Sequence, residues 1–185
     1  MSALQTVAVA VFALYLSLLP LRIGNILFRM KKQVRTEQTQ RATKTIVILA
    51  FPGSQILDIT GPYQVFVRAA EIFLRTHPDC KAPYRVLLAS TTPSKHIPTN
   101  CGLNLEASVV LRSVRGPIHT LLVAGGSGVE KASHDKDVIV WLRKISPGVE
   151  RLGSICTGAF LLASAGLLDG KRAAVDGGDR EALLS

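Results

Sequence analysis

Apolar runs and helix-like patterns alternate along most of the chain. Residues 45–51 (TIVILAF) form a continuous run rich in β-branched side chains, which is typical of a strand buried on both faces. Similar runs predict further strands at 84–89, 118–124 and 151–155. Helical spacing of apolar residues predicts helices at 59–74, 135–145 and 159–165. This alternation favours an α/β fold with a mostly parallel sheet that is covered by helices on both faces.

The first predicted helix and one loop can be described in more detail. Thr60 is expected to cap the helix, and Pro62 to lie in its first turn. The buried face of the helix is expected to consist of Val65, Phe66, Ala69, Ile72 and Phe73. Residues 91–104 have the composition of a loop, within which a small hairpin is expected.

Residues 1–21 carry no charge, and residues 7–21 are almost wholly apolar. Arg22 and Asn25 interrupt this run before the apolar residues 26–28. A membrane-crossing helix needs about 20 apolar residues, so residues 1–28 predict a transmembrane anchor in which Arg22 reaches the headgroups. A translation start placed too far upstream is the other interpretation. Residues 29–44 are polar and basic and predict a linker. Because the basic residues follow the apolar run, the positive-inside rule places a domain at 45–185 in the cytoplasm, anchored to the inner membrane.

The net charge of +9 raises the question of nucleic-acid binding. Residues 1–45 hold seven basic side chains and one acidic one, whereas the other 140 residues hold fifteen basic and twelve acidic ones. Most of the excess charge therefore lies outside the predicted globular part. The hydrophobic content of the whole chain, 48%, is ample for a buried core. We expect no nucleic acid to bind through these residues.

The three cysteines and four histidines are scattered along the chain. An odd number of widely spaced cysteines without a CxxC pair favours free thiols in a reducing compartment. Cys80 and Cys101 are interpreted as incidental, and so are the histidines His77, His96, His119 and His134. We expect no metal site and no cofactor.

Candidate functional residues follow the ends of three predicted strands. They are Asp58 after the first strand, Gly125 and Gly126 after the third, and Cys156 with Thr157 after the fourth. Ligands bind at the carboxyl ends of strands in open parallel sheets, so we expect these residues to form one site. The residues around Cys156 predict a sharp turn between a strand and a helix, which holds a nucleophilic sulfur out of the sheet.

The chemistry of this site has a functional and a plainer interpretation. Cys156 is the candidate nucleophile, Asp58 its candidate proton shuttle, and the amides of Gly125 and Gly126 a candidate oxyanion hole. The plainer interpretation is an inert cysteine, a helix cap and a tight turn. No histidine lies where a base for Cys156 is expected from the strand order.

Residues 45–172 resemble the ThiJ/PfpI superfamily, which is also described as class I glutamine amidotransferase-like. The resemblance is carried by AFPGSQILDITGPYQVF at 50–66, LLVAGGSGV at 121–129 and, above all, GSICTGAFLLASAGLLDGKRA at 153–173. Within that superfamily, the chain is similar to the amidotransferase-like domain of GlxA-type AraC-family transcription regulators. Isonitrile hydratases share much of the pattern.

This resemblance implies a flavodoxin-like three-layer sandwich that is usually dimeric. It implies catalytic roles for Asp58, Cys156 and Thr157, and it places Gly125 and Gly126 in an oxyanion pocket. In the regulators, the same pocket is implied to sense a small, often nitrogenous metabolite, while a C-terminal domain binds DNA.

Two departures from the family pattern affect the expected function. After GKRA the family usually continues with a Thr-Thr-His-Trp-like strand, whereas residues 174–177 read AVDG, so that the matching histidine is missing. The sequence ends at Ser185, and we expect a domain that is truncated at its C-terminus and has no DNA-binding module.

Three functions follow from these expectations. The first is a small-molecule-sensing domain related to the GlxA-type regulators. The alternatives are a Cys156-dependent small-molecule hydrolase or hydratase, similar to isonitrile hydratase, and a non-functional truncated remnant. The motifs VWLRKI and GAFLLASAGLLDGKRA favour the sensing domain. The missing histidine counts against a papain-like or amidotransferase-like mechanism.

Overall fold

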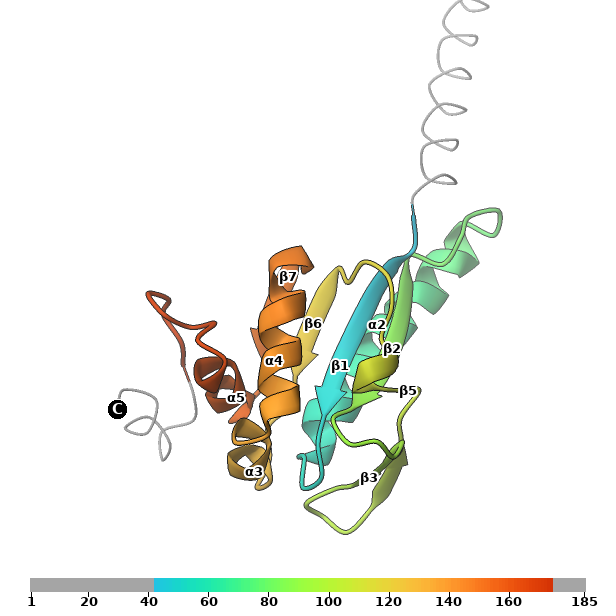
Figure 1. The fold of residues 1–185 in the computed structure, drawn as a ribbon. Coiled ribbons are helices and arrows are strands. Elements are labelled where there is room, and N and C mark those ends of the chain that lie inside the picture. Colours follow the sequence, from blue (N-terminus) through green and yellow to red (C-terminus); the bar gives the residue numbers. More distant parts are fainter. Residues whose placement is uncertain (1–41, 175–185) are drawn as a thin grey trace, which may run out of the picture. The chain divides into compact units, whose positions relative to one another are not determined.

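A computed structural model describes residues 42–174 (Figure 1). Residues 42–78 and 82–174 belong to one compact unit, whereas 79–81 do not. The predicted anchor at 1–28 and nearly all of the predicted linker lie outside the described residues. Between residues 42 and 174, no helix is both long enough and apolar enough to cross a membrane.

Five parallel strands form the central sheet, in the order β5-β2-β1-β6-β7. They are β1 (Lys44–Ala50), β2 (Tyr84–Ser90), β5 (Val109–Val110), β6 (Thr120–Val123) and β7 (Arg151–Ser154). The predicted parallel sheet is confirmed, and all four predicted strands are present. Strand β5 was not predicted, because two residues are too few to show a period. The expected hairpin is also present, as the antiparallel pair β3 (His96–Pro98) and β4 (Asn104–Glu106).

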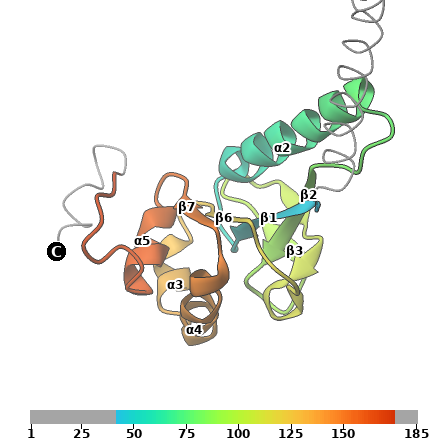
Figure 2. The same ribbon diagram turned by 90° about the horizontal axis from the view of Figure 1, so that it is seen from above.

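Helices cover both faces of the sheet and complete the three layers (Figure 2). The long helix α2 (Ile56–Thr76) lies on one face. The opposite face carries α3 (Val129–Ser133), α4 (Lys136–Ile145) and α5 (Gly158–Ser164). Two short 3-10 turns, η1 (Leu111–Ser113) and η2 (Ser146–Gly148), connect elements. The predicted α/β class with a mostly parallel sheet is therefore confirmed.

Strand β1 forms the centre of the core because it is apolar on both sides. Val47 and Leu49 are fully buried beneath α4 and α5. Ile48 and Ala50, which alternate with them, are fully buried on the α2 side. Burial on both faces explains why this strand reads as an unbroken hydrophobic run.

Helix α2 begins at Ile56, three residues before the predicted start. The prediction that Thr60 caps this helix is wrong, since its hydroxyl donates a hydrogen bond of 2.9 Å to the carbonyl oxygen of Ile56, inside the helix. Pro62 consequently lies in the helix interior and not in the first turn. With this start, Asp58 lies in the first turn of α2.

The predicted buried face of α2 is wrong in part. Val65 is 65% exposed and Ile72 is 51% exposed, and Ala69 is exposed as well. The residues that α2 buries are Ile59 and Ala70, with Asp58. The helix carries two adjacent apolar columns, and only one of them packs against the sheet, so periodicity alone does not distinguish them.

Candidate functional site

The candidate site lies at the carboxyl edge of the sheet, where β1 and β6 are neighbours. The chain leaves β1 toward β2 on one side, and it continues on the other side from β6 to β7. This reversal of strand order is the place where open α/β sheets bind ligands. In Figure 1 the arrowheads of β1 and β6 point to this edge, where the start of α2 is also found.

The Asp58 carboxylate is buried and points to the loop after β6. It is only 9% exposed, and its Oδ2 accepts a hydrogen bond of 3.0 Å from the backbone N–H of Gly125. Burial raises the pKa of the Asp58 carboxyl above its ordinary value, and the hydrogen bond from Gly125 opposes that rise. A carboxyl group with a raised pKa stays protonated to a higher pH than an ordinary one, which suits it to donating a proton.

Thr157 contacts the neighbouring glycine of the same loop. Its hydroxyl oxygen accepts a hydrogen bond of 2.9 Å from the backbone N–H of Gly126. The same hydroxyl lies 3.4 Å from the carbonyl oxygen of Gly126. The two successive amides that were proposed as an oxyanion hole thus each donate to a side chain of the site.

Gly125 lies close to both Asp58 and Thr157 and leaves no room for a side chain of its own. A Cβ atom at Gly125 would lie 2.8 Å from the Thr157 hydroxyl oxygen and 2.9 Å from Asp58 Oδ2. No side chain fits between them, so glycine is required here for close approach. The structure therefore brings Asp58, Gly125, Gly126 and Thr157 together.

Cys156 occupies the turn between β7 and α5. Its φ is 51°, and it is the one non-glycine residue between 42 and 174 with positive φ. The left-handed conformation costs about 1–2 kcal/mol for a residue with a Cβ. Cys156 is exposed, and Gly158, the first residue of α5, donates a hydrogen bond of 3.1 Å to Ile155 across the turn. The predicted strand–turn–helix connection is present, with the thiol at its apex.

The β3–β4 hairpin is attached to the site, which the sequence did not reveal. Gly53 donates a backbone hydrogen bond of 2.7 Å to Pro98, and Asn100 donates one of 3.1 Å to Ser54. Ser54 in turn forms a β-bridge with Gly126. No spacing in the sequence links residues 98–100 to the glycine loop, because the contact depends on the path of the backbone.

Cys101 lies in the turn of this hairpin and is exposed. Its sulfur is 3.3 Å from the Thr99 hydroxyl oxygen. Hydrogen bonding with Thr99 lowers the pKa of the Cys101 thiol. Cys101 was interpreted as incidental from the sequence, but its environment makes it unsuitable as an unreactive reference for Cys156.

No imidazole contacts the Cys156 thiol within the described part of the chain. His77 contacts Thr76 and Phe73, His119 contacts Thr120, and His134 contacts Glu130. Residues 42–174 also contain no group of three or more His, Cys, Asp or Glu side chains that could hold a metal ion. The polar side chains that the loop after β6 gathers at this edge are thus the carboxyl group of Asp58 and the hydroxyl group of Thr157.

Comparison with known proteins assigns the chain to a family. The model of the DJ-1/PfpI family matches residues 44–180, which is most of the sequence. The chain belongs to the DJ-1/PfpI family, and the resemblance to ThiJ/PfpI proteins seen in its motifs is confirmed. A solved structure with the same fold is oxidized DJ-1 from Toxoplasma gondii, with a TM-score of 0.62 and 15% identity over 75% of this chain and 70% of that one.

The match covers a different share of the length of each of three sequence relatives. An uncharacterized protein from Streptomyces lividans is 30% identical over 69% of this chain and 84% of its own length. Isonitrile hydratase from Pseudomonas putida is 30% identical over 69% of this chain and 50% of its own length. An HTH-type transcriptional regulator from Mycobacterium tuberculosis is 42% identical over 28% of this chain and 20% of its own length. The chain thus spans half or less of the two relatives with a stated function.

Proposed function

We propose that this chain is a small-molecule-sensing domain that binds its ligand beside Cys156, Asp58 and Thr157. The observation that carries the proposal is the pair of hydrogen bonds that hold Asp58 and Thr157 on the amides of Gly125 and Gly126. These bonds fix polar side chains next to an exposed thiol and supply no imidazole base. Such a site is suited to recognition of a small polar ligand, in agreement with the regulator among the relatives.

The second candidate function is a hydratase of small nitrogenous substrates, favoured by the raised pKa of Asp58. In an isonitrile, the Cys156 sulfur would add to the terminal carbon while the Asp58 carboxyl protonates that carbon. Water would then replace the sulfur and give an N-substituted formamide. Similarity to isonitrile hydratase supports this candidate, although the match spans only half of that enzyme.

Alkylation of Cys156 in the full chain distinguishes the functions. Iodoacetamide labelling with mass-spectrometric assignment is carried out in a Cys101→Ser background, because hydrogen bonding with Thr99 lowers the pKa of the Cys101 thiol. We expect Cys156 to be alkylated in the folded chain, since the turn leaves its sulfur exposed. A sensor ligand would slow this labelling without being consumed.

The same assay with cyclohexyl isocyanide, acetamide and urea as probes separates the outcomes. Release of N-cyclohexylformamide, which is abolished in Cys156→Ala, would establish the hydratase. Protection of Cys156 by a probe that is recovered unchanged would support ligand binding without turnover, as the sensing function requires. No protection of Cys156 by any probe, together with no product, would contradict both functions and leave the non-functional remnant.

We also propose that the chain forms a homodimer through the outward face of α2. Large and small residues alternate there at intervals of three or four positions, namely Leu57, Gly61, Val65, Ala69 and Ile72, and all five are exposed. Alternating ridges and gaps are what two helices need in order to interlock. Three of the large apolar side chains exposed within residues 42–174 lie on this one helix.

Val65→Glu is expected to convert the dimer to a monomer, because it places a charge at the centre of this apolar column. The mass of the full chain in mild detergent, measured by sedimentation, reports the change. Gln64→Glu is the control, since it adds the same charge at an adjacent exposed position of α2. If both variants retain the mass of the wild type, the dimer does not use this face.

For location, we propose the cytoplasmic side of the inner membrane, with residues 1–28 as the anchor.

A further inference from the structure

A second hollow lies at the carboxyl end of β2 and β5, away from the residues around Cys156. Its volume is about 250 Å³. The lining residues come from the loop after β2, from η1 with the residue before it, and from the start of α4, and they are Thr91, Thr92, Pro93, Val110, Leu111, Arg112, Asp135 and Asp137. None of the candidate residues of the first site belongs to it.

The polar loop after β2 is held in place by its own hydrogen bonds. Thr91 donates a backbone hydrogen bond of 3.0 Å to Ala50, at the end of β1. The Thr92 hydroxyl donates to the carbonyl oxygen of Ser94 at 3.0 Å. The nearby side chain of Leu111 is only 3% exposed and belongs to the main core. The hollow thus has an apolar floor and a polar loop that is held in place by hydrogen bonds.

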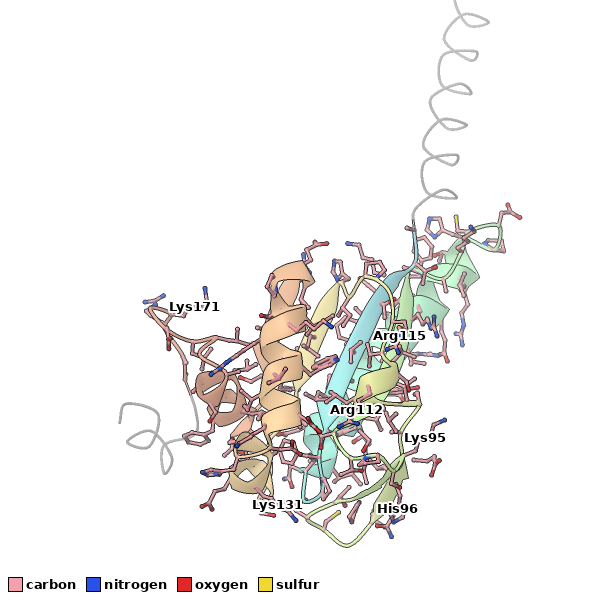
Figure 3. All side chains as sticks on the ribbon, viewed as in Figure 1. Lys95, His96, Arg112, Arg115, Lys131 and Lys171 are labelled. Carbon is pink, nitrogen blue, oxygen red and sulfur yellow. The ribbon has the colours of Figure 1, made fainter. Side chains whose placement is uncertain are left out.

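Opposite charges line the hollow from different elements. Arg112 lies on η1, on the side of the sheet that α4 covers, as Figure 3 shows. It donates a hydrogen bond to Asp137, in the first turn of α4. Asp135 uses Oδ1 to accept from the N–H of Asp137 at 2.9 Å and of Val138 at 3.4 Å, as the cap of α4.

The ion pair between Arg112 and Asp137 is easily opened. Their side chains are 76% and 69% exposed. Exposed pairs contribute little to stability, since both groups remain well solvated when they separate. A ligand that offers each group a new partner can therefore replace the pair without leaving a buried charge unpaired.

We propose that this hollow binds an α-amino acid with a small aliphatic side chain. Its carboxylate would pair with Arg112, its ammonium group with Asp137, and its side chain would contact Val110 and Leu111. A simple anion would face two carboxylates, and a simple cation would face the guanidinium, so a zwitterion matches both walls. The volume lies below the usual range of about 300–1,000 Å³ for drug-sized ligands, which suits a molecule of this size.

Ligand-observed NMR titration of the full chain tests this proposal with three matched probes. L-leucine carries both charges, 3-methylbutylamine lacks the carboxylate, and 4-methylpentanoate lacks the ammonium group. We expect L-leucine to bind at least tenfold more tightly than either analogue. Arg112→Gln is expected to reduce the affinity for L-leucine to that for the amine, and Asp137→Asn to reduce it to that for the carboxylate.

Two controls keep the test specific. Lys95→Gln removes an exposed cation from the connection between β2 and β5 that does not line the hollow, and it is expected to leave binding unchanged. Cys156→Ala is likewise expected to leave leucine binding unchanged, which separates this hollow from the site of the proposed function. Equal affinity for all three probes, no binding of L-leucine, or full affinity in Arg112→Gln would each overturn the proposal.

Discussion

Replacing Gly158 with alanine is expected to lower the free energy of unfolding by about 3 kcal/mol. A Cβ atom at this position would lie 2.3 Å from the carbonyl oxygen of Val123 and 2.8 Å from that of Ala124. These atoms belong to the backbone at the end of β6, so no side chain can move aside to make room. The start of α5 would have to leave the sheet, and Cys156 would move with it.

Chemical denaturation followed by circular dichroism measures this loss. Gly148→Ala is the matched control, because nothing lies within 4 Å of the Cβ that it would add. We expect that control to stay within about 0.5 kcal/mol of the wild type. If Gly158→Ala were as stable as the control, α5 would not be held against β6 by this contact, and the turn at Cys156 would not depend on it.

Asp58→Asn is expected to abolish ligand protection of Cys156 and to change how stability depends on pH. Burial raises the pKa of Asp58 in the folded chain above its value in the unfolded chain. Below the ordinary carboxyl pKa of about 4, both states are protonated and this group costs nothing. As pH rises through the raised pKa of the folded state, the buried charge lowers the free energy of unfolding. Asparagine keeps an acceptor for the N–H of Gly125 but carries no charge, so the free energy of unfolding of Asp58→Asn is not expected to fall over this pH range.

The measurement is the free energy of unfolding of both proteins at a series of pH values from acid to neutral. Only the difference in slope matters, since any constant offset from the new amide group is independent of pH. Glu106→Gln in β4 serves as the control, because that carboxylate is exposed. Parallel curves for the wild type and Asp58→Asn would show that the carboxyl group is not destabilised by burial.

The positions of the strands could be predicted because their signals are local. The β-branched run of β1 and the apolar run of β2 need no knowledge of their neighbours. The meeting of Asp58, Gly125 and Thr157 could also be anticipated, because parallel strands deliver their carboxyl ends to one edge. What each side chain would bind could not, since the hydrogen bonds to Gly125 and Gly126 depend on loop geometry within fractions of an ångström.

The errors of prediction have physical causes of the same kind. Thr60 and Pro62 resemble a helix start, yet α2 begins at Ile56 because the turn after β1 places the chain there. The apolar residues Val65 and Ile72 have helical spacing, but only contact with the sheet decides which column is buried. The hairpin that carries Cys101 was expected, whereas its attachment to the turn at Gly53 is a tertiary contact without a local signal.

Selection for stability and selection for ligand recognition favour different residues at position 156. A left-handed φ of 51° favours glycine over any residue with a Cβ by about 1–2 kcal/mol. A population of variants selected only for thermal stability would therefore accumulate glycine at this position. A population selected for recognition of a ligand at the thiol would keep cysteine, so the identity of this one residue records which of the two properties has been maintained.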